Sequence, residues 1–294
     1  MSISLWLPPV AALVISFFTS MAGVSGAFLL LPLQMSVLGF TSPAVSATNL
    51  VFNLVATPSG VYRYWRERRI LWPLVLLVVV GTAPGVIAGC FIRLSFFPDP
   101  RRFKAFVGLV LLWIAARLVM DIVKSRGKAG AVQPSQDWHA RTIEFTSRRL
   151  AFEFQERKYE CKPAGVFVLS LIVGLIGGIY GIGGAAIIAP FLVAIYGLPV
   201  HTIAGATLMG TLVTSVVGVG FYQLIAPLYQ SSGLMVAPNW TLGLSFGVGG
   251  MAGMYLGART QRLVPAIYLK TMLALILFGI AVPYLLGYLR AGHI

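Results

Sequence analysis

The chain has 294 residues, of which 58% are hydrophobic and only 10% charged, and its formal net charge is +14. Soluble domains carry about a quarter charged residues and need a charged face on each element, so this composition excludes a soluble globular protein. The Lys and Arg residues gather in short clusters beside apolar tracts, as the positive-inside rule predicts. We therefore expect membrane lipids as partners of these bases, and no nucleic acid.

Eight apolar segments follow one another along the chain, at residues 5–38, 42–62, 72–92, 103–123, 164–196, 200–227, 240–258 and 266–289. The first and fifth are too long for a simple span, which takes about 20 residues. Each is interrupted by a glycine cluster, Gly23-Val24-Ser25-Gly26 or Gly181-Ile182-Gly183-Gly184, and each carries a proline beyond it, Pro32 or Pro190. The pattern predicts an all-α polytopic membrane protein with two broken helices.

The two broken segments belong to an internal repeat. A shift of 158 residues aligns residues 17–64 with 175–222 without a gap and yields 11 identities. After a change of register, Gly81, Gly85 and Gly89 align with Gly249, Gly253 and Gly257. We therefore predict two structural repeats of four to five helices, each with a broken first helix. The alternative is that glycine-rich membrane helices merely resemble one another.

Three regions follow from this division: a first transmembrane repeat at 1–123, a linker at 124–162 and a second transmembrane repeat at 163–294. The linker carries nine Lys or Arg residues and is expected in the cytoplasm. Its middle alternates apolar and polar residues, which predicts a β-hairpin around Ile143, Phe145, Leu150, Phe152 and Phe154. A disordered linker is the alternative.

Charge also bears on the direction of the repeats. Four arginines (Arg63, Arg66, Arg68 and Arg69) follow the second segment, whereas the equivalent loop at 228–239 has no charge. This contrast favours inverted repeats, in which each broken first segment folds back and supplies an extra crossing. The basic residues Arg93, Arg101, Arg102 and Lys104 then lie outside. Eight plain spans in parallel repeats are the alternative.

The two breaks are the predicted substrate site. Where a helix breaks in a membrane, its freed backbone groups must line a polar cavity or be buried in protein, and a helix that begins there presents N–H groups suited to an anion. A polar helix face follows each break. The predicted substrate-binding residues are Gly23, Ser25, Gly26, Thr48, Asn49, Asn53, Gly181, Gly183, Gly184, Thr207 and Thr211. We expect the breaks to meet at one cavity; close helix packing by small residues is the alternative.

All eight Asp and Glu residues lie in loops or at segment ends. Proton relays and sodium sites usually rest on buried carboxylates, so the sequence argues against a pump or a cation antiporter and for a neutral-lined anion path. We expect no Lys or Arg well inside the spans, and backbone N–H groups, hydroxyls and amides as the anion's ligands. A passive anion channel is an alternative function.

An enzyme is a further alternative. Gly23-Val24-Ser25-Gly26 has the G-x-S-G form found in rhomboid intramembrane proteases, for which His201 or His293 would have to supply the base. The repeat places Gly183 where a second serine would stand, so an intramembrane serine hydrolase is disfavoured and we expect no enzyme. No metal or nucleotide motif is present in the sequence, and we expect no cofactor.

At these residues the chain resembles the sulfite exporter TauE/SafE family, also called the toluenesulfonate uptake permeases. The motifs that carry the resemblance are Gly23–Pro32 with Val45–Leu50, Gly181–Pro190 with Leu198–His201 and Ala204–Thr207, and the glycines from Gly249 to Gly257. The resemblance implies a duplicated, multi-pass carrier of the bacterial inner (cytoplasmic) membrane for sulfite, sulfonates or related organosulfur anions. The partners we expect are this small anion, lipids and, as a candidate homodimer, a second copy of the chain.

Overall fold

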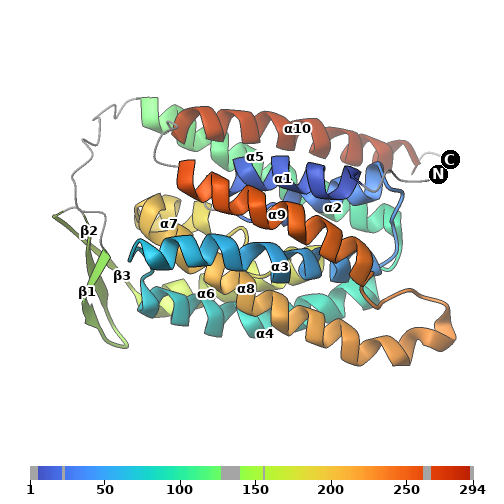
Figure 1. Ribbon diagram of the computed structural model, residues 1–294, viewed down its shortest axis with the longest axis horizontal. Helices are drawn as coiled ribbons and strands as arrows, with labels where there is room; N and C mark the ends of the chain where they lie inside the picture. Colours follow the sequence, from blue (N-terminus) through green and yellow to red (C-terminus); the bar gives the residue numbers. More distant parts are fainter. Residues whose placement is uncertain (1–5, 22–23, 127–139, 155, 261–265, 292–294) are drawn as a thin grey trace.

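The computed structural model describes residues 6–21, 24–126, 140–154, 156–260 and 266–291, which form an elongated helical bundle with a small sheet beyond one end (Figure 1). The elements are α1 (Leu7–Met21), α2 (Ala27–Ser36), α3 (Ala44–Arg66), α4 (Trp72–Phe96), α5 (Pro100–Arg126), β1 (Ala140–Phe145), β2 (Leu150–Phe154), β3 (Arg157–Cys161), α6 (Pro163–Tyr180), α7 (Ala189–Tyr196), α8 (Val200–Ile225), the 3-10 helix η1 (Ala226–Ser232), α9 (Trp240–Thr260) and α10 (Ala266–Ala291). Within this part of the chain four helices are long and apolar enough to cross a membrane, at Trp72–Phe96, Pro100–Met120, Pro163–Tyr180 and Thr202–Ser231. The protein is an all-α polytopic membrane protein with a small sheet beyond one end of its bundle.

Both long apolar segments are broken at their glycine clusters. In the second, α6 ends at Gly181, whose φ of +80° lies in the left-handed region that glycine adopts without steric cost. Gly183 repeats this conformation with a φ of +84°, and the chain re-enters a helix only at α7. In the first segment α1 and α2 are separate helices on either side of the cluster. Each segment therefore yields two helices, the second of which (α2 or α7) is too short to cross a membrane.

The equivalent helices α3 and α8 run in opposite directions. A Cβ at Gly218, near the end of α8, would lie 2.6 Å from Leu50 Cδ1, near the start of α3. A Cβ at Gly60, near the end of α3, would lie 3.2 Å from Leu208 Cδ1, near the start of α8. Helices α3 and α8 are therefore antiparallel, although the 158-residue repeat makes them equivalent.

Two rows of glycines pack a helix of one half closely against a helix of the other half. In α4, Gly81, Gly85 and Gly89 face the backbone of α6, and a Cβ at Gly85 would lie 2.5 Å from the Leu171 carbonyl oxygen. In α9, the equivalent glycines face the backbone of α1, and a Cβ at Gly253 would lie 2.3 Å from the Leu13 carbonyl oxygen. Small residues permit this close approach of membrane helices. The fourth helix of each half therefore packs against the first helix of the other half: α4 against α6, and α9 against α1.

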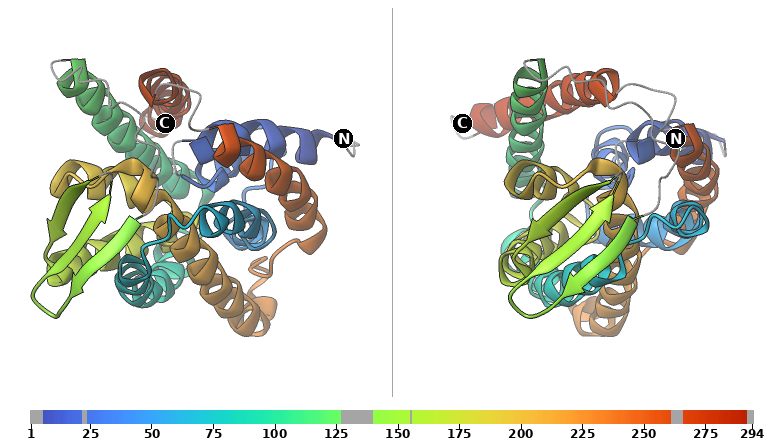
Figure 2. Two further views of the ribbon diagram at one scale, coloured as in Figure 1. Left: turned by 60° about the vertical axis from the view of Figure 1, so that its left-hand side comes forward. Right: turned by 90° about the vertical axis from the view of Figure 1, so that its left-hand side faces the viewer.

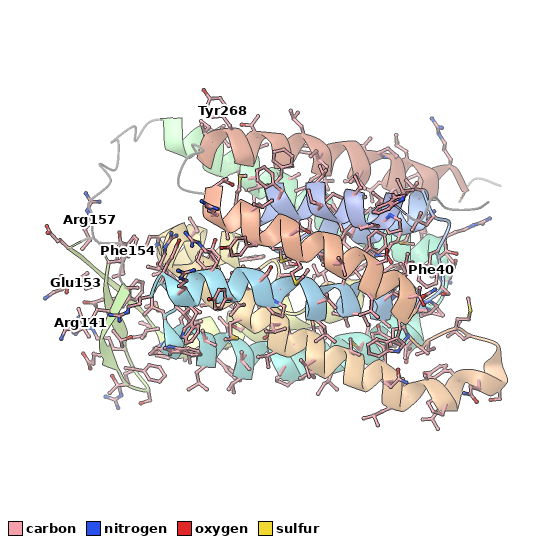
Figure 3. The ribbon with its side chains drawn as sticks, in the orientation of Figure 1. Phe40, Arg141, Glu153, Phe154, Arg157 and Tyr268 are labelled. Atoms are coloured by element: carbon pink, nitrogen blue, oxygen red, sulfur yellow. The ribbon has the colours of Figure 1, made fainter. Side chains whose placement is uncertain are left out.

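The linker region forms a three-stranded antiparallel sheet in the order β1-β2-β3, one strand more than the hairpin expected from the alternation. On β2, Phe152 and Phe154 are buried, and the Phe152 ring stacks on Tyr159 at 5.4 Å. Charged side chains such as Arg141 and Glu153 project outward from the strands (Figure 3). The sheet covers the end of the bundle where the α3–α4 connection also lies (Figures 1 and 2).

Candidate functional site

Asn49 on α3 joins the two helix breaks. Its Nδ2 donates to the Ala27 carbonyl at the first break and to the Gly181 carbonyl at the second, each at 2.9 Å. Its Oδ1 accepts a hydrogen bond from Gln34 Nε2 of α2 at 3.3 Å. Both hydrogens of the fully buried amide are therefore bound to backbone carbonyls, which have no water to bond in this interior.

Asn53 repeats this arrangement one turn further along α3. Its Nδ2 donates to the Ile182 carbonyl at 2.8 Å, and its Oδ1 accepts a hydrogen bond from Ser25 Oγ at 2.5 Å. Ser25 Oγ in turn accepts a hydrogen bond from the Ala27 amide at the start of α2, at 3.2 Å. One face of α3 therefore brings Ser25, Asn49, Asn53 and Gly181 together, all predicted site residues.

Helix α8 supplies the opposite wall of the second break. The Gly184 amide donates to Thr214 Oγ1 at 3.0 Å. A Cβ at Gly183 would lie 3.0 Å from both Thr211 Cγ2 and Ser215 Oγ, so only glycine fits without displacing these polar side chains. Ser215 Oγ is buried and has no hydrogen-bond partner among the described residues. Thr214 and Ser215 share the polar face of α8 noted in the sequence, although the predicted site stops at Thr211.

The two remaining predicted threonines, Thr48 and Thr207, form hydrogen bonds with backbone groups outside the breaks. Thr48 Oγ1 donates to the Ala44 carbonyl at 2.7 Å and accepts from the Asn239 amide at 2.9 Å, which turns it toward the start of α9. Thr207 lies one turn before Thr211, and its hydroxyl donates to the Ala204 carbonyl of its own helix at 3.1 Å. Adjacent positions on a helix face about 100° apart, so Thr48 cannot share the face of Asn49.

The glycines of the first break have separate positions. Gly26 packs on α1, where an added Cβ would lie 2.8 Å from Ser16 Oγ, and its carbonyl accepts from the Leu30 amide at 3.0 Å. Gly23 lies outside the described residues. Gly26 therefore allows the first break to pack closely on α1, and neither Asn49 nor Asn53 forms a hydrogen bond with it.

Sequence reasoning missed Tyr180, the last residue of α6. Its hydroxyl donates to the Phe28 carbonyl of α2 at 2.7 Å, and its own carbonyl accepts from Ser46 Oγ at 3.4 Å. Tyr180 thus provides a second link between the two breaks, in addition to the asparagines. The only signal in the sequence is its position directly before the glycine cluster.

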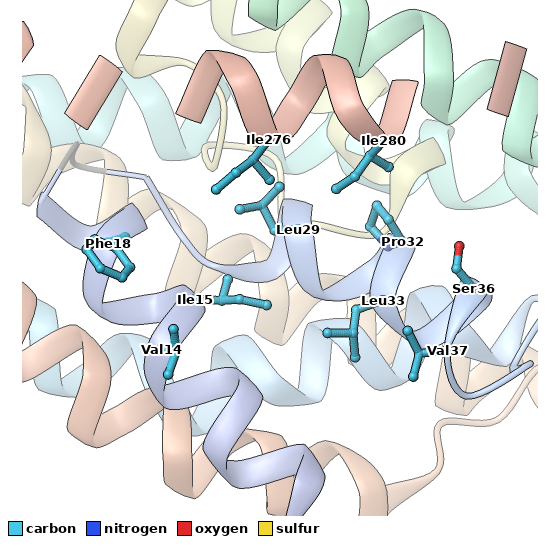
Figure 4. Close-up of a pocket in the computed structure, with 10 residues that line it drawn as sticks. All are labelled: Val14, Ile15, Phe18, Leu29, Pro32, Leu33, Ser36, Val37, Ile276 and Ile280. Atoms are coloured by element: carbon cyan, nitrogen blue, oxygen red, sulfur yellow. The ribbon is translucent and has the colours of Figure 1, made fainter. Parts of the chain in front are cut away.

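The meeting point of the breaks is closed in this conformation. Ser25, Asn49, Asn53 and Thr211 each have an exposed fraction of 0%. A separate pocket of about 430 Å³ lies between α1, α2 and α10, and its lining is apolar apart from Ser36 (Figure 4). None of the residues joined by Asn49 lines this pocket, so the structure places the predicted site in a closed polar layer rather than in an open cavity.

The geometry at Ser25 bears on the hydrolase alternative. A serine nucleophile needs a general base that accepts its proton. The Ser25 hydroxyl instead donates to the side-chain amide oxygen of Asn53. Such an oxygen is not a base at physiological pH. In this conformation Ser25 positions the start of α2 and is not activated for catalysis.

One expectation about charge is wrong. The predicted third segment ended at residue 92, which placed Arg93 in an outside loop. Helix α4 continues to Phe96, and Arg93 is fully buried within the bundle. The apolar segment ends at residue 92 because Arg93 is the next charged residue, but the helical hydrogen bonds of α4 continue for another turn, to Phe96.

A bundle of apolar helices in which two broken helices, contributed by halves of opposite direction, meet in a buried polar layer is the architecture of a membrane transporter. Residues 9–284 match the family described as Sulfite exporter TauE/SafE, and the chain belongs to this family.

Curated relatives carry similar descriptions. A "Probable membrane transporter protein" of Xylella fastidiosa (strain Temecula1) is 24% identical over 251 residues, covering 83% of this chain and 79% of the relative. The "Probable membrane transporter protein YjnA" of Bacillus subtilis is 25% identical over 265 residues, covering 88% and 91%. The "Probable membrane transporter protein YunE" of the same organism is 20% identical over 274 residues, covering 90% and 92%. No solved structure matches the chain.

Proposed function

We propose that the protein is a secondary transporter that carries a small oxyanion, namely sulfite, a sulfonate or a related organosulfur anion, across the bacterial inner membrane, and that it is not an enzyme. The observation that carries the proposal is the buried junction in which Asn49 and Asn53 hold both helix breaks. The name of the family directs attention to sulfite. The curated relatives are named only as probable membrane transporters, so the substrate rests on the site's chemistry and on the family description.

The donor set suits an anion. Among the side chains that the structure describes, no Asp or Glu is buried, so a buried carboxylate for a proton or sodium ion is lacking there. Hydroxyls and amides surround the breaks instead. An outward-moving anion would be driven by the inside-negative potential alone, at about 2.3 kcal/mol per charge per 100 mV.

The closed junction defines what transport requires. The amide hydrogens of Asn49 and Asn53 bond to the carbonyls of Ala27, Gly181 and Ile182. An anion can use these donors only when the loops move and free them. Rocking of one half against the other about the junction would open it to one side of the membrane and then the other. Loop carbonyls would recover their partners when the anion leaves, which favours release.

The sheet end of the bundle is our proposed cytoplasmic face. The α3–α4 connection lies at this end and carries Arg68, just after Arg63 and Arg66 in the last turn of α3, while the strands carry further exposed bases such as Arg141 and Arg157 (Figures 1 and 3). Cytoplasmic loops of membrane proteins are enriched in Lys and Arg.

The test is transport by the purified protein in proteoliposomes. Flux of labelled sulfite, methanesulfonate, toluenesulfonate and sulfate would be measured with and without an imposed potential. We expect saturable flux of at least one sulfur oxyanion and counterflow when unlabelled anion is preloaded. Flux that does not saturate and shows no counterflow would establish a passive channel instead. Absence of flux and of binding for all four anions would overturn the proposal.

A further inference from the structure

Arg93 is a cation buried inside a membrane bundle without a counter-charge. Its side chain is fully buried, on the last turn of α4. No carboxylate of the described residues pairs with it, although Arg63, Arg69 and Arg149 all form ion pairs with glutamates. An unpaired charge in such an interior carries a large desolvation cost, and intramembrane charges without a structural partner mark ligand or ion pathways.

The hydrogen bonds of the guanidinium leave one arm free. Nε donates to Ser46 Oγ at 3.4 Å, and Nη1 donates to the Phe97 carbonyl, which caps the end of α4. Nη2 is buried and has no hydrogen-bond partner among the residues that the structure describes. Arg93 Cζ lies 3.6 Å from the ring centroid of Phe103 on α5, which fixes the orientation of the guanidinium but does not neutralise its charge.

A second donor lies near the guanidinium. The Tyr222 hydroxyl of α8 is buried close to Arg93, Ser46 and Cys90, and among the described residues no acceptor meets it in hydrogen-bond geometry. Ser46 also touches the second break, because its Cβ lies 2.3 Å from the position that a Cβ would take at Gly181. Helices α3, α4, α5 and α8 therefore converge beside the closed junction on two donors, Arg93 Nη2 and the Tyr222 hydroxyl, that have no acceptor in the described part of the chain.

We infer that Arg93 is the charged ligand of the transported oxyanion, bound through its free Nη2 with the Tyr222 hydroxyl as a neutral donor, and that the Ser46 hydroxyl joins them when it leaves the Tyr180 carbonyl. The free Nη2 carries two N–H groups that can donate to oxygens of a sulfite or sulfonate group, while Nε and Nη1 hold the guanidinium in place, which a lysine ammonium could not reproduce. The position lies between the second break and the end of the bundle away from the sheet, where the α4–α5 connection is found (Figure 1). This inference rests on the proposed function and names the residue that recognises charge.

A structural role makes the opposite prediction about stability. If Arg93 only caps α4 and stacks on Phe103, its removal lowers the stability of the anion-free protein. If it is a ligand that awaits an anion, replacing it with an apolar side chain of similar length removes an uncompensated buried charge, and the anion-free protein is at least as stable as before.

The experiment compares wild type, Arg93→Met, Arg93→Lys, Tyr222→Phe and the control Arg101→Met, whose side chain is exposed. Thermal unfolding and calorimetric binding would be measured in detergent with sulfite and with methanesulfonate. We expect Arg93→Met to bind at least tenfold more weakly with an unfolding temperature no lower than wild type. Arg93→Lys and Tyr222→Phe should bind several-fold more weakly, and Arg101→Met should match wild type.

Two results would overturn the inference. One is binding within twofold of wild type by both Arg93→Met and Tyr222→Phe. The other is a lowered unfolding temperature of anion-free Arg93→Met together with normal binding by Tyr222→Phe, which assigns a structural role. If Arg93→Met does not fold, Tyr222→Phe and Arg93→Lys decide alone: normal binding by both overturns the inference. Failure of the wild type to bind either anion would count against the proposed function itself, so the two failures are distinguishable.

Discussion

Asn49 Nδ2 lies 2.9 Å from the carbonyl oxygen of Gly181, a residue 132 positions further along the chain. The same nitrogen binds the Ala27 carbonyl of the first break. A single amide therefore ties together two loops that were expected to offer free donors to an anion. The amide has a structural role in the closed state, and its contribution to anion binding requires those loops to open.

Replacement of Asn49 by leucine should lower stability as well as anion affinity. A buried carbonyl left without a donor costs about 1–3 kcal/mol; the change strands the Gly181 carbonyl and removes the second donor of the Ala27 carbonyl, which also accepts within α2. We expect a clearly lower unfolding temperature in detergent. Gln223→Leu is the matched control, because it removes an amide of similar size from an exposed position on α8 and should leave stability nearly unchanged. Equal unfolding temperatures for the two variants would contradict the junction described here.

The glycine rows should tolerate no added methyl group. A Cβ at Gly85 would lie 2.5 Å from the Leu171 carbonyl oxygen and 2.8 Å from the Leu175 amide, both backbone atoms that cannot turn aside. Gly85→Ala must therefore separate α4 from α6, at a cost of about 1–3 kcal/mol. Gly220 has open space around it, so Gly220→Ala should be neutral or slightly stabilising. Thermal unfolding of both variants checks this, and an unaffected Gly85→Ala would show that the helices are less closely packed.

Alanine substitutions at Gly181 and Gly197 distinguish the cost of a strained backbone from the cost of a steric collision. Both have positive φ, +80° and +65°, so alanine at either is strained by about 1–2 kcal/mol. Only at Gly181 would the new Cβ collide, 2.3 Å from Ser46 Cβ, whereas Gly197 faces open space. Gly181→Ala should therefore be the more destabilising of the two, and Ser46→Gly added to it should recover part of the loss. The same loss in both alanine variants would mean that Ser46 moves aside freely.

The opposite directions of α3 and α8 can be tested by labelling cysteines from the two sides of the membrane. Arg68 lies just after α3 and Gln230 in η1 just after α8, both exposed and at equivalent ends of antiparallel helices. Cysteines at these positions should react with a membrane-impermeant maleimide from opposite sides of the membrane, Gln230→Cys in intact cells and Arg68→Cys only after permeabilisation. Labelling of both from one side would refute the arrangement.

The native cysteines should not obscure that result. Burial raises the pKa of Cys161 to about 11, so its thiol is protonated and weakly reactive at neutral pH, and becomes a thiolate only as the pH rises toward that value. Cys90 is buried within α4. The chain without added cysteines should remain unlabelled, and any labelling of it sets the background.

Much of the helical layout could be predicted from the sequence, because apolar length and glycine clusters act locally. The break at Gly181 is one example, since its left-handed backbone suits the residue itself. Partners distant in the chain could not be predicted in this way. Asn49 faces the breaks while Thr48 faces α9, and this depends on the rotation of α3 in the bundle. Arg93 fell outside the predicted span because hydropathy drops at any charged residue, whatever surrounds its side chain in the fold.

The exchange of first helices between the halves bears on how the chain is made. The glycine face of α4 leaves the ribosome long before α6, against whose backbone it packs, has been synthesised. In the same way, α1 is synthesised long before its partner α9. Neither half can complete its packing on the nascent chain alone. A gene cut in the linker at 127–139 should therefore yield two fragments that are degraded when expressed singly and that rescue one another when expressed together.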